Sequence, residues 1–154
     1  MRKSLRVLEL AVVGAVFAGL LGAAIGETGT TEEARAMLER AVAALKADEA
    51  AALAAFTAGA QGFKDRDLYV FCGDAVDGTT TAHGGDPARV GQSMRDVTDE
   101  TGKKFGEELI AAAAEGEFNV VEYVWPRPGQ TEGVPKASYV TRVVDQICGV
   151  GYYK

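Results

Sequence analysis

Asn119-Val-Val-Glu-Tyr-Val-Trp-Pro-Arg-Pro-Gly129 opens the last third of the chain, followed by Val134-Pro-Lys-Ala-Ser-Tyr-Val-Thr-Arg-Val-Val144 and Gln146-Ile-Cys-Gly-Val-Gly-Tyr-Tyr-Lys154. Each stretch is rich in β-branched and aromatic residues, which is typical of β-strands, and the breaks between them are turns. Two tight connections in succession predict an antiparallel sheet. The sheet gathers tyrosine, tryptophan and lysine side chains, a combination suited to capture of a small, flat, anionic molecule.

The residues before this sheet predict a long helix, two further strands and a shorter helix. Residues 30–62 carry one apolar stripe, with Thr30 or Thr31 as the helix cap. Residues 68–72 and 79–83 read as strands joined by a turn at Asp77-Gly78, and residues 104–115 form a helix that ends at Gly116. The expected fold is α+β, with a long N-terminal helix packed on a five-stranded antiparallel sheet.

The first 26 residues have the pattern of a secretory signal peptide. Met1-Arg-Lys-Ser-Leu-Arg6 is basic, and an uncharged run of 17 residues from Leu10 closes in small residues at Gly26. An uncleaved membrane anchor is the alternative, although this run is at the lower limit for a spanning helix. Either interpretation predicts one domain, residues 27–154, that is periplasmic or extracellular (secreted, or tethered by the N-terminal helix).

The charge balance argues against nucleic acid as a partner. The chain carries a net charge of −6 and its first 26 residues carry +2, which leaves −8 on residues 27–154. An acidic domain repels nucleic acid and anionic lipid surfaces, and no cluster of lysine and arginine offsets this charge.

No pattern in the sequence predicts catalysis, a cofactor or a metal site. The chain lacks a Gly-x-Ser-x-Gly elbow, a phosphate-binding glycine loop, a zincin motif and a Cys–His pairing. His83, the only histidine, ends a predicted strand beside two glycines, where the backbone can approach a ligand closely. A structural hydrogen bond at the strand end is the alternative role for His83.

The strongest candidates for ligand contacts lie in the C-terminal strands. Tyr123 and Trp125 share one strand face, although core packing is the ordinary role of such rings. Lys136 and Tyr139 offer donors for a carboxylate, but strict alternation places them on opposite faces unless a bulge near Pro135 intervenes. Further possible carboxylate partners are the loop residues Arg89, Arg95 and Arg127.

The chain has two cysteines, Cys72 and Cys148, each inside a predicted strand. In an exported protein a disulfide is plausible if the two strands are neighbours. Two small buried thiols are the alternative, because free cysteines also pack well in cores.

Several short motifs, in this order and spacing, resemble the single Cache domain family of extracytoplasmic ligand-sensing domains. They are Asp67-Leu-Tyr-Val-Phe71, the Gly78 turn with Ala82-His83, Tyr123-x-Trp-Pro126, Pro135-Lys-x-x-Tyr-Val140 and Cys148-Gly-Val-Gly-Tyr-Tyr153. The resemblance runs from about Glu32 to Lys154 and implies a PAS-like sheet. In that fold the first and last strands are neighbours, which strengthens the case for a Cys72–Cys148 disulfide.

The resemblance also implies a ligand and a way of signalling. Ligands of the family are usually small organic acids or similar metabolites, and the matching positions here are Tyr123, Trp125, Lys136, Tyr139 and His83, with Phe71, Arg89 and Arg95 as weaker candidates. Because no output domain follows the last strand, we expect a stand-alone sensory domain that docks onto a membrane sensor kinase, chemoreceptor or transporter.

Two other classes of function stay open at this point. One is an interaction scaffold of the same fold whose pocket is filled by its own side chains. The other is a redox or metal-associated protein that uses Cys72, Cys148 and His83.

Overall fold

The computed structural model describes residues 28–154, so the predicted signal peptide or anchor lies outside the described residues. The N-terminal part forms two helices, α1 (Thr31–Ala47) and α2 (Glu49–Ala58), where one long helix was predicted. Asp48 is extended (φ −159°, ψ 99°) and accepts a hydrogen bond from the Ala51 amide, so it ends α1 and caps α2. The periodicity did not reveal this break because Asp48 is exposed and leaves the apolar stripe uninterrupted.

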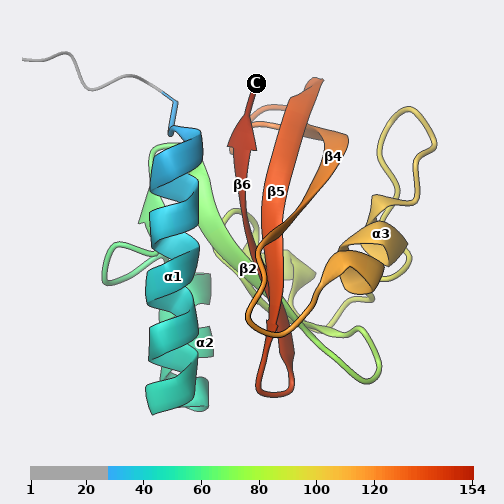
Figure 1. The fold of residues 1–154 in the computed structure, drawn as a ribbon. Coiled ribbons are helices and arrows are strands. Elements are labelled where there is room, and N and C mark those ends of the chain that lie inside the picture. The colour runs from blue at the N-terminus through green and yellow to red at the C-terminus, as the bar shows by residue number, and fades with distance from the viewer. Residues whose placement is uncertain (1–27) are drawn as a thin grey trace, which may run out of the picture.

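Six antiparallel strands form one sheet (Figure 1). Their bounds are β1 (Lys64–Asp65), β2 (Leu68–Asp74), β3 (Thr80–His83), β4 (Asn119–Pro126), β5 (Gly133–Val143) and β6 (Gln146–Tyr153). The order is β1-β2-β6-β5-β4, and β3 pairs with β2 as well. The five predicted strands are confirmed. The prediction missed β1, because two residues show no periodicity.

Helices lie on both sides of the sheet (Figure 1). α1 and α2 lie on one side, and α3 (Phe105–Ala112) lies on the other. α3 is shorter than the predicted helix because Ala113 is already extended, and the Asn119 side chain donates a hydrogen bond to the last helical carbonyl, that of Ala112. The loop between β3 and α3 contains one short 3-10 turn, η1 (Pro87–Arg89).

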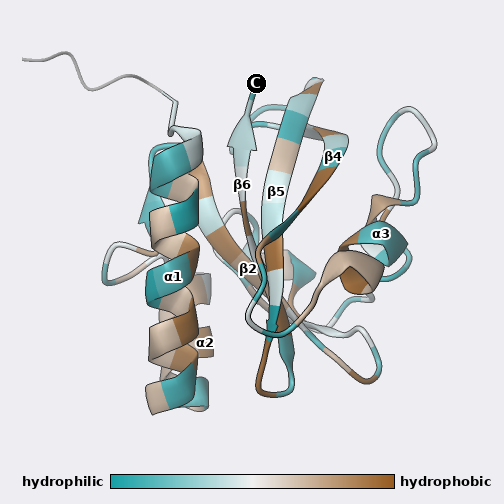
Figure 2. Cartoon of the chain, in the orientation of Figure 1, coloured by the Kyte–Doolittle hydropathy of each residue, from teal (hydrophilic) through white to brown (hydrophobic). Residues whose placement is uncertain are grey.

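Strand alternation divides the buried side chains into two cores, one on each face of the sheet. The core under α1 and α2 takes Leu68, Val70, Cys72, Val143, Cys148 and Val150 from the strands. The core on the α3 side takes Tyr69, Phe71, Val121, Tyr123, Val140 and Ile147. Hydrophilic and hydrophobic bands alternate along α1 in Figure 2, as expected for a helix that has one side on the core and the other in solvent.

A disulfide joins β2 to β6 in the core under α1. Cys72 and Cys148 are direct partners in the antiparallel ladder, their Cα atoms are 4.1 Å apart and their sulfur atoms are bonded. Both side chains are fully buried. The bond links residues 76 positions apart in sequence, so it restricts the unfolded chain strongly.

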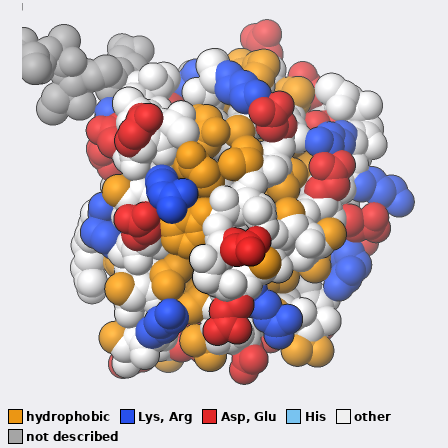
Figure 3. Space-filling view, in the orientation of Figure 1, with side chains coloured by type: hydrophobic (Ala, Val, Ile, Leu, Met, Phe, Trp, Pro, Cys, Tyr) orange, Lys and Arg blue, Asp and Glu red, His pale blue; other side chains and the backbone are white. Residues whose placement is uncertain are grey.

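The surface view in Figure 3 shows acidic and basic side chains interspersed over this face, with a hydrophobic strip between them. This face therefore has no basic patch of the kind that nucleic acid requires. Among residues 28–154, no helix combines the length and the apolar character needed to cross a bilayer.

Candidate functional site

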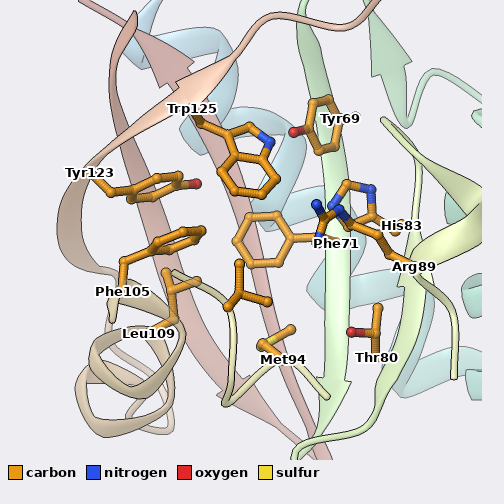
Figure 4. Close-up of a pocket in the computed structure, with 11 residues that line it drawn as sticks. Tyr69, Phe71, Thr80, His83, Arg89, Met94, Phe105, Leu109, Tyr123 and Trp125 are labelled. Atoms are coloured by element: carbon orange, nitrogen blue, oxygen red, sulfur yellow. The ribbon is translucent and has the colours of Figure 1, made fainter. Parts of the chain in front are cut away.

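A cleft opens on the α3 side of the sheet (Figure 4). Its inner chamber lies between β2, β3 and β4 and is covered by α3 and the loop before it. The space measures about 430 Å³ with its open mouth included, and it is lined by Tyr69, Phe71, Thr80, His83, Arg89, Met94, Val97, Phe105, Leu109, Tyr123 and Trp125. Most of this space is the mouth and the gaps between side chains, because the free cavity is only about 40 Å³, room for a very small group or a few water molecules.

Strand alternation and a glycine position the cleft side chains. Tyr69 and Phe71 project from β2, and Tyr123 and Trp125 from β4, toward the same side of the sheet. On the central strand β6, Gly149 has no side chain to block them: an added Cβ would be 2.5 Å from the Phe71 ring. The Phe71 ring therefore reaches across β6 into the floor of the cleft.

One wall of the inner chamber is apolar. The Phe105 ring from α3 stacks on the Tyr123 ring, with centroids 4.0 Å apart and planes within 3°, and it meets Trp125 edge-on at 5.3 Å. Leu109 and Met94 complete this wall beside Phe105 (Figure 4). Such a wall favours a hydrocarbon or aromatic group over a charged one.

The opposite side of the chamber carries hydrogen-bond donors. An outer, more polar hollow adjoins the chamber, and four residues line both spaces: Tyr69, His83, Arg89 and Trp125. We call Tyr69, His83 and Arg89 the donor cluster, because each can donate a hydrogen bond into the cleft. Trp125 separates this cluster from the apolar wall (Figure 4).

His83 is a neutral donor. Its Nδ1 accepts a hydrogen bond from the Asp86 amide at 2.9 Å, which places the ring hydrogen on Nε2. Burial lowers the pKa of His83 to about 4, and the positive charges of Arg89 and Lys136 add to this effect. The imidazole is therefore uncharged at neutral pH. The sequence offered two alternative roles for His83, a structural hydrogen bond and a ligand contact. The structure shows the hydrogen bond, and it also places His83 in the lining of the cleft.

Arg89 supplies the positive charge of the donor cluster. Its guanidinium carbon lies 4.6 Å from the centre of the Trp125 ring, a cation–π contact. Its Nε lies 3.6 Å from an Asp86 carboxylate oxygen, which neutralises part of the charge on the side facing solvent. The remaining guanidinium nitrogens have no other hydrogen-bond partner among residues 28–154.

Lys136 lies behind the donor cluster and not in the cleft. Its Nζ donates to the hydroxyl oxygens of Tyr69 at 2.9 Å and Tyr153 at 3.3 Å. Tyr153 in turn donates to the Pro126 carbonyl oxygen. The Tyr69 hydroxyl also lies close to the Trp125 and Tyr153 side chains. Its oxygen accepts from Lys136, and its one hydrogen can go either to the Tyr153 oxygen or to a ligand. Burial raises the pKa of Tyr69 to about 12, so this hydroxyl stays protonated.

The structure corrects the sequence prediction for Tyr139. β4 and β5 pair without a register shift from Gly133 to Val140, so there is no bulge near Pro135. Lys136 and Tyr139 consequently lie on opposite faces. Tyr139 packs on the α1 side, with its ring 5.7 Å from Tyr152 and near the Arg35 guanidinium.

The two remaining arginine candidates differ in position. Arg127 lines the outer hollow, where it pairs with Asp67 and stacks over the Tyr153 ring at 4.3 Å. Arg95 is exposed and lines neither the inner chamber nor the outer hollow.

Sequence reasoning missed six cleft residues: Tyr69, Thr80, Met94, Val97, Phe105 and Leu109. Tyr69 could have been found, because it shares a strand face with Phe71, which was a candidate. Phe105 and Leu109 lie within the helix predicted over residues 104–115, but a helix period does not distinguish a core from a cleft wall. Met94 lies in an irregular loop that offers no period at all.

The redox and metal hypothesis does not fit the geometry. Cys72 and Cys148 are bonded to each other in the core under α1, whereas His83 lines the cleft on the other side of the sheet. No three potential metal ligands converge anywhere in residues 28–154.

The comparison with family models decides the classification. The model described as Single Cache domain 2 matches residues 26–153. The chain belongs to this family. The match confirms the resemblance carried by the strand motifs, and the helices packed on a six-stranded antiparallel sheet are those of a Cache sensor domain.

Solved structures of chemotaxis sensors share the fold of this Cache domain. A methyl-accepting chemotaxis protein from Vibrio parahaemolyticus is 26% identical with a TM-score of 0.66, over 79% of this chain and 86% of that one. The periplasmic sensor domain of a chemotaxis protein is 28% identical with a TM-score of 0.60, over 79% and 88%. A Cache chemosensory domain solved to explain carboxylic acid recognition is 24% identical with a TM-score of 0.58, over 79% and 86%. Among curated proteins none matches this chain.

Proposed function

We propose that this Cache domain binds a small carboxylate-type metabolite outside the cytoplasm and passes the signal to a separate membrane protein. The observation that carries the proposal is the donor cluster, in which the Tyr69 hydroxyl, the His83 Nε2–H and the Arg89 guanidinium line one side of the chamber. The other lining side chains are mainly apolar, with hydroxyl groups on Thr80 and Tyr123. A carboxylate has two acceptor oxygens and one negative charge, and these three donors complement it.

The rest of the chamber narrows the class of ligand. Its lining contains no aspartate or glutamate, so the ammonium group of an amino acid would find no carboxylate partner there. The apolar wall of Phe105, Leu109 and Met94 is also a poor site for a second carboxylate. We therefore propose a monocarboxylate whose short apolar tail points toward α3.

The sensory role is supported by the relatives. Two solved structures above 25% identity belong to chemotaxis proteins, and one of them is described as a periplasmic sensor domain. For this chain we propose the same compartment, with a membrane sensor kinase, chemoreceptor or transporter as the partner that receives the signal. A pull-down from membranes with and without ligand would test that step.

Titration calorimetry tests the ligand. The purified protein is titrated with propionate, butyrate and benzoate, and with alanine, succinate and propionamide for comparison. We expect binding of the monocarboxylates, weakened about 10- to 100-fold by Arg89→Gln, because a hydrogen bond to a charged group is worth about 1.5–3 kcal/mol. Arg142→Gln, at an exposed position on β5, makes the same charge change and should bind normally. Unchanged binding in Arg89→Gln would contradict the proposed site.

One observation favours the scaffold as a second candidate. Phe105 and Tyr123 are 4% and 7% exposed and stack on each other, so they fill much of the chamber themselves. A chamber that stays closed would give no heat and no shift in melting temperature with any compound of the series. That result in a well-folded protein would favour the scaffold.

A further inference from the structure

Lys136 does not line the cleft, but it donates a hydrogen bond to Tyr69 of the donor cluster. We propose that Lys136 makes the site selective for anions over neutral analogues, because it takes up a proton when an anion binds the donor cluster. The inference rests on the proposed function, since it requires an anionic ligand in the cleft. It concerns a positioning residue that acts on the ligand through Tyr69.

The Lys136 side chain is fixed inside the protein. It is 1% exposed, and the backbone of Gly151 on β6 provides its space: a Cβ added there would be 2.1 Å from Lys136 Cε. The Lys136 side chain is therefore closely enclosed, with the β6 backbone directly against its Cε atom.

The surroundings of Lys136 lack a matching negative charge. Its two hydrogen-bond partners are phenol oxygens, and its Nζ lies 4.3 Å and 4.6 Å from the ring centres of the same residues, Tyr69 and Tyr153. No carboxylate among residues 28–154 lies within salt-bridge distance. Buried lysines are normally paired with an acid, so this arrangement is unusual.

Several neighbouring elements place titratable or charged groups around the Lys136 amine. The titratable and charged groups that face it are Asp67 and Tyr69 at β2, His83 of β3, Arg89 of η1, Tyr123 of β4, Arg127 after β4 and Tyr153 of β6. Asp67 is the nearby acid, and it already accepts hydrogen bonds from the Gly29 amide and from Arg127. Burial lowers the pKa of Lys136, Asp67 raises it and Arg127 lowers it, with a value of about 7 as the result.

An anion at the donor cluster supplies the missing charge. Its oxygen would accept the Tyr69 hydrogen, so that one hydroxyl group separates it from the Lys136 amine. A negative charge at this distance favours the ammonium form and raises the pKa of Lys136. Protonation and anion binding then strengthen each other, because linkage between two binding events is reciprocal. A neutral analogue has no charge to drive this coupling.

Calorimetry with propionate and propionamide in buffers of different ionisation heat measures the coupling directly. Near pH 7.5 we expect the protein to take up a fraction of one proton for each propionate bound and none for propionamide. Propionate affinity should fall about tenfold between about pH 6 and about pH 8.5, the range in which the free amine loses its proton, while propionamide affinity stays constant.

Lys136→Met keeps the length of the side chain and removes the charge. It should abolish proton uptake and reduce the preference for propionate over propionamide, whereas Lys46→Met, on the exposed side of α1, should retain both. Lysine Cε resonances of the wild-type protein provide a second readout that does not depend on the variant folding. The buried lysine should titrate near neutral pH without ligand and at higher pH with propionate.

Three results would overturn the inference. They are propionate binding without proton uptake, uptake that persists in Lys136→Met, and a wild-type protein in which every lysine titrates near the usual pKa of about 10.4. The absence of propionate binding at any pH is a different result. It would remove the proposed function, and this inference with it.

Discussion

The two faces of the sheet are built from the same strands but are packed in opposite ways. On the α1 side, β2 and β6 contribute Val70, Cys72, Cys148 and Val150, all 0% exposed, and a disulfide closes the layer. On the α3 side, β2 contributes large rings, while β6 contributes glycines at the positions where those rings and Lys136 lie. On the α1 side, side chains from the strands and from the helices fill the core. On the α3 side, the packing leaves a cleft.

The difference shows that one face of the sheet mainly provides stability, while the other face is available for ligand binding. Well-packed aliphatic side chains and a covalent bond on one face supply stability, so the other face can hold a buried lysine and a cleft lined by hydrogen-bond donors. Substitutions on the α1 side should therefore change the free energy of unfolding and leave ligand affinity alone. Substitutions on the cleft side should change both.

Removal of the disulfide should give the largest effect. The double variant Cys72→Ala/Cys148→Ala should lose about 4 kcal/mol of unfolding free energy, the expectation for a bond that closes a loop of this length. Chemical denaturation measures the loss, and reduced wild-type protein is the matched control. Below the unfolding transition, propionate affinity should match that of the wild type. A large loss of affinity in the folded variant would show that the two faces are not independent.

A methyl group on the cleft face should be costly for a different reason. Gly151→Ala places a Cβ against Lys136 Cε, and overpacking of this kind costs about 1–3 kcal/mol. Propionate affinity should fall as well, because a displaced Lys136 no longer supports Tyr69. A double-mutant cycle with Lys136→Ala identifies the cause, since the cost of Gly151→Ala should shrink once the long side chain is gone. Additive effects would mean that the clash lies elsewhere.

The buried amine also predicts a pH effect on stability without any ligand. The folded pKa of Lys136, about 7, lies below the unfolded value of about 10.4, so the unfolded chain binds more protons between these values. Wild-type stability should therefore rise with pH in this window, relative to Lys136→Met, by at most about 1.4 kcal/mol per pH unit. Urea unfolding of both proteins from about pH 7 to pH 9 measures the difference. A constant difference would mean that Lys136 keeps an ordinary pKa.

The sequence predicted most of the fold because strands and turns leave local patterns. The strand alternation, the Asp77-Gly78 turn and the caps are all visible in the chain itself. The break at Asp48 was hidden, since an exposed residue does not disturb an apolar stripe. The two-residue strand β1 was too short to show any period.

The cleft was predicted less completely because it depends on contacts between distant segments. Tyr123, Trp125, Phe71, His83 and Arg89 do line it. The tautomer of His83, however, depends on a loop amide, and the burial of Lys136 depends on a glycine of another strand. The hydrophobic pattern of a single segment cannot predict such contacts with another segment.

The smallest expected effect separates Tyr69, which the sequence analysis did not name, from Tyr139, which it named as a ligand contact. Tyr69→Phe removes a hydroxyl from the donor cluster and should weaken propionate binding about tenfold, which corresponds to roughly 1.4 kcal/mol. Tyr139→Phe removes a hydroxyl on the α1 side of β5 and should leave affinity within the error of calorimetry. Both changes delete one oxygen and keep the ring, so packing cannot account for a difference between them. Equal losses would mean that the ligand does not bind on the α3 side of the sheet, and the division of roles between the two faces would fail.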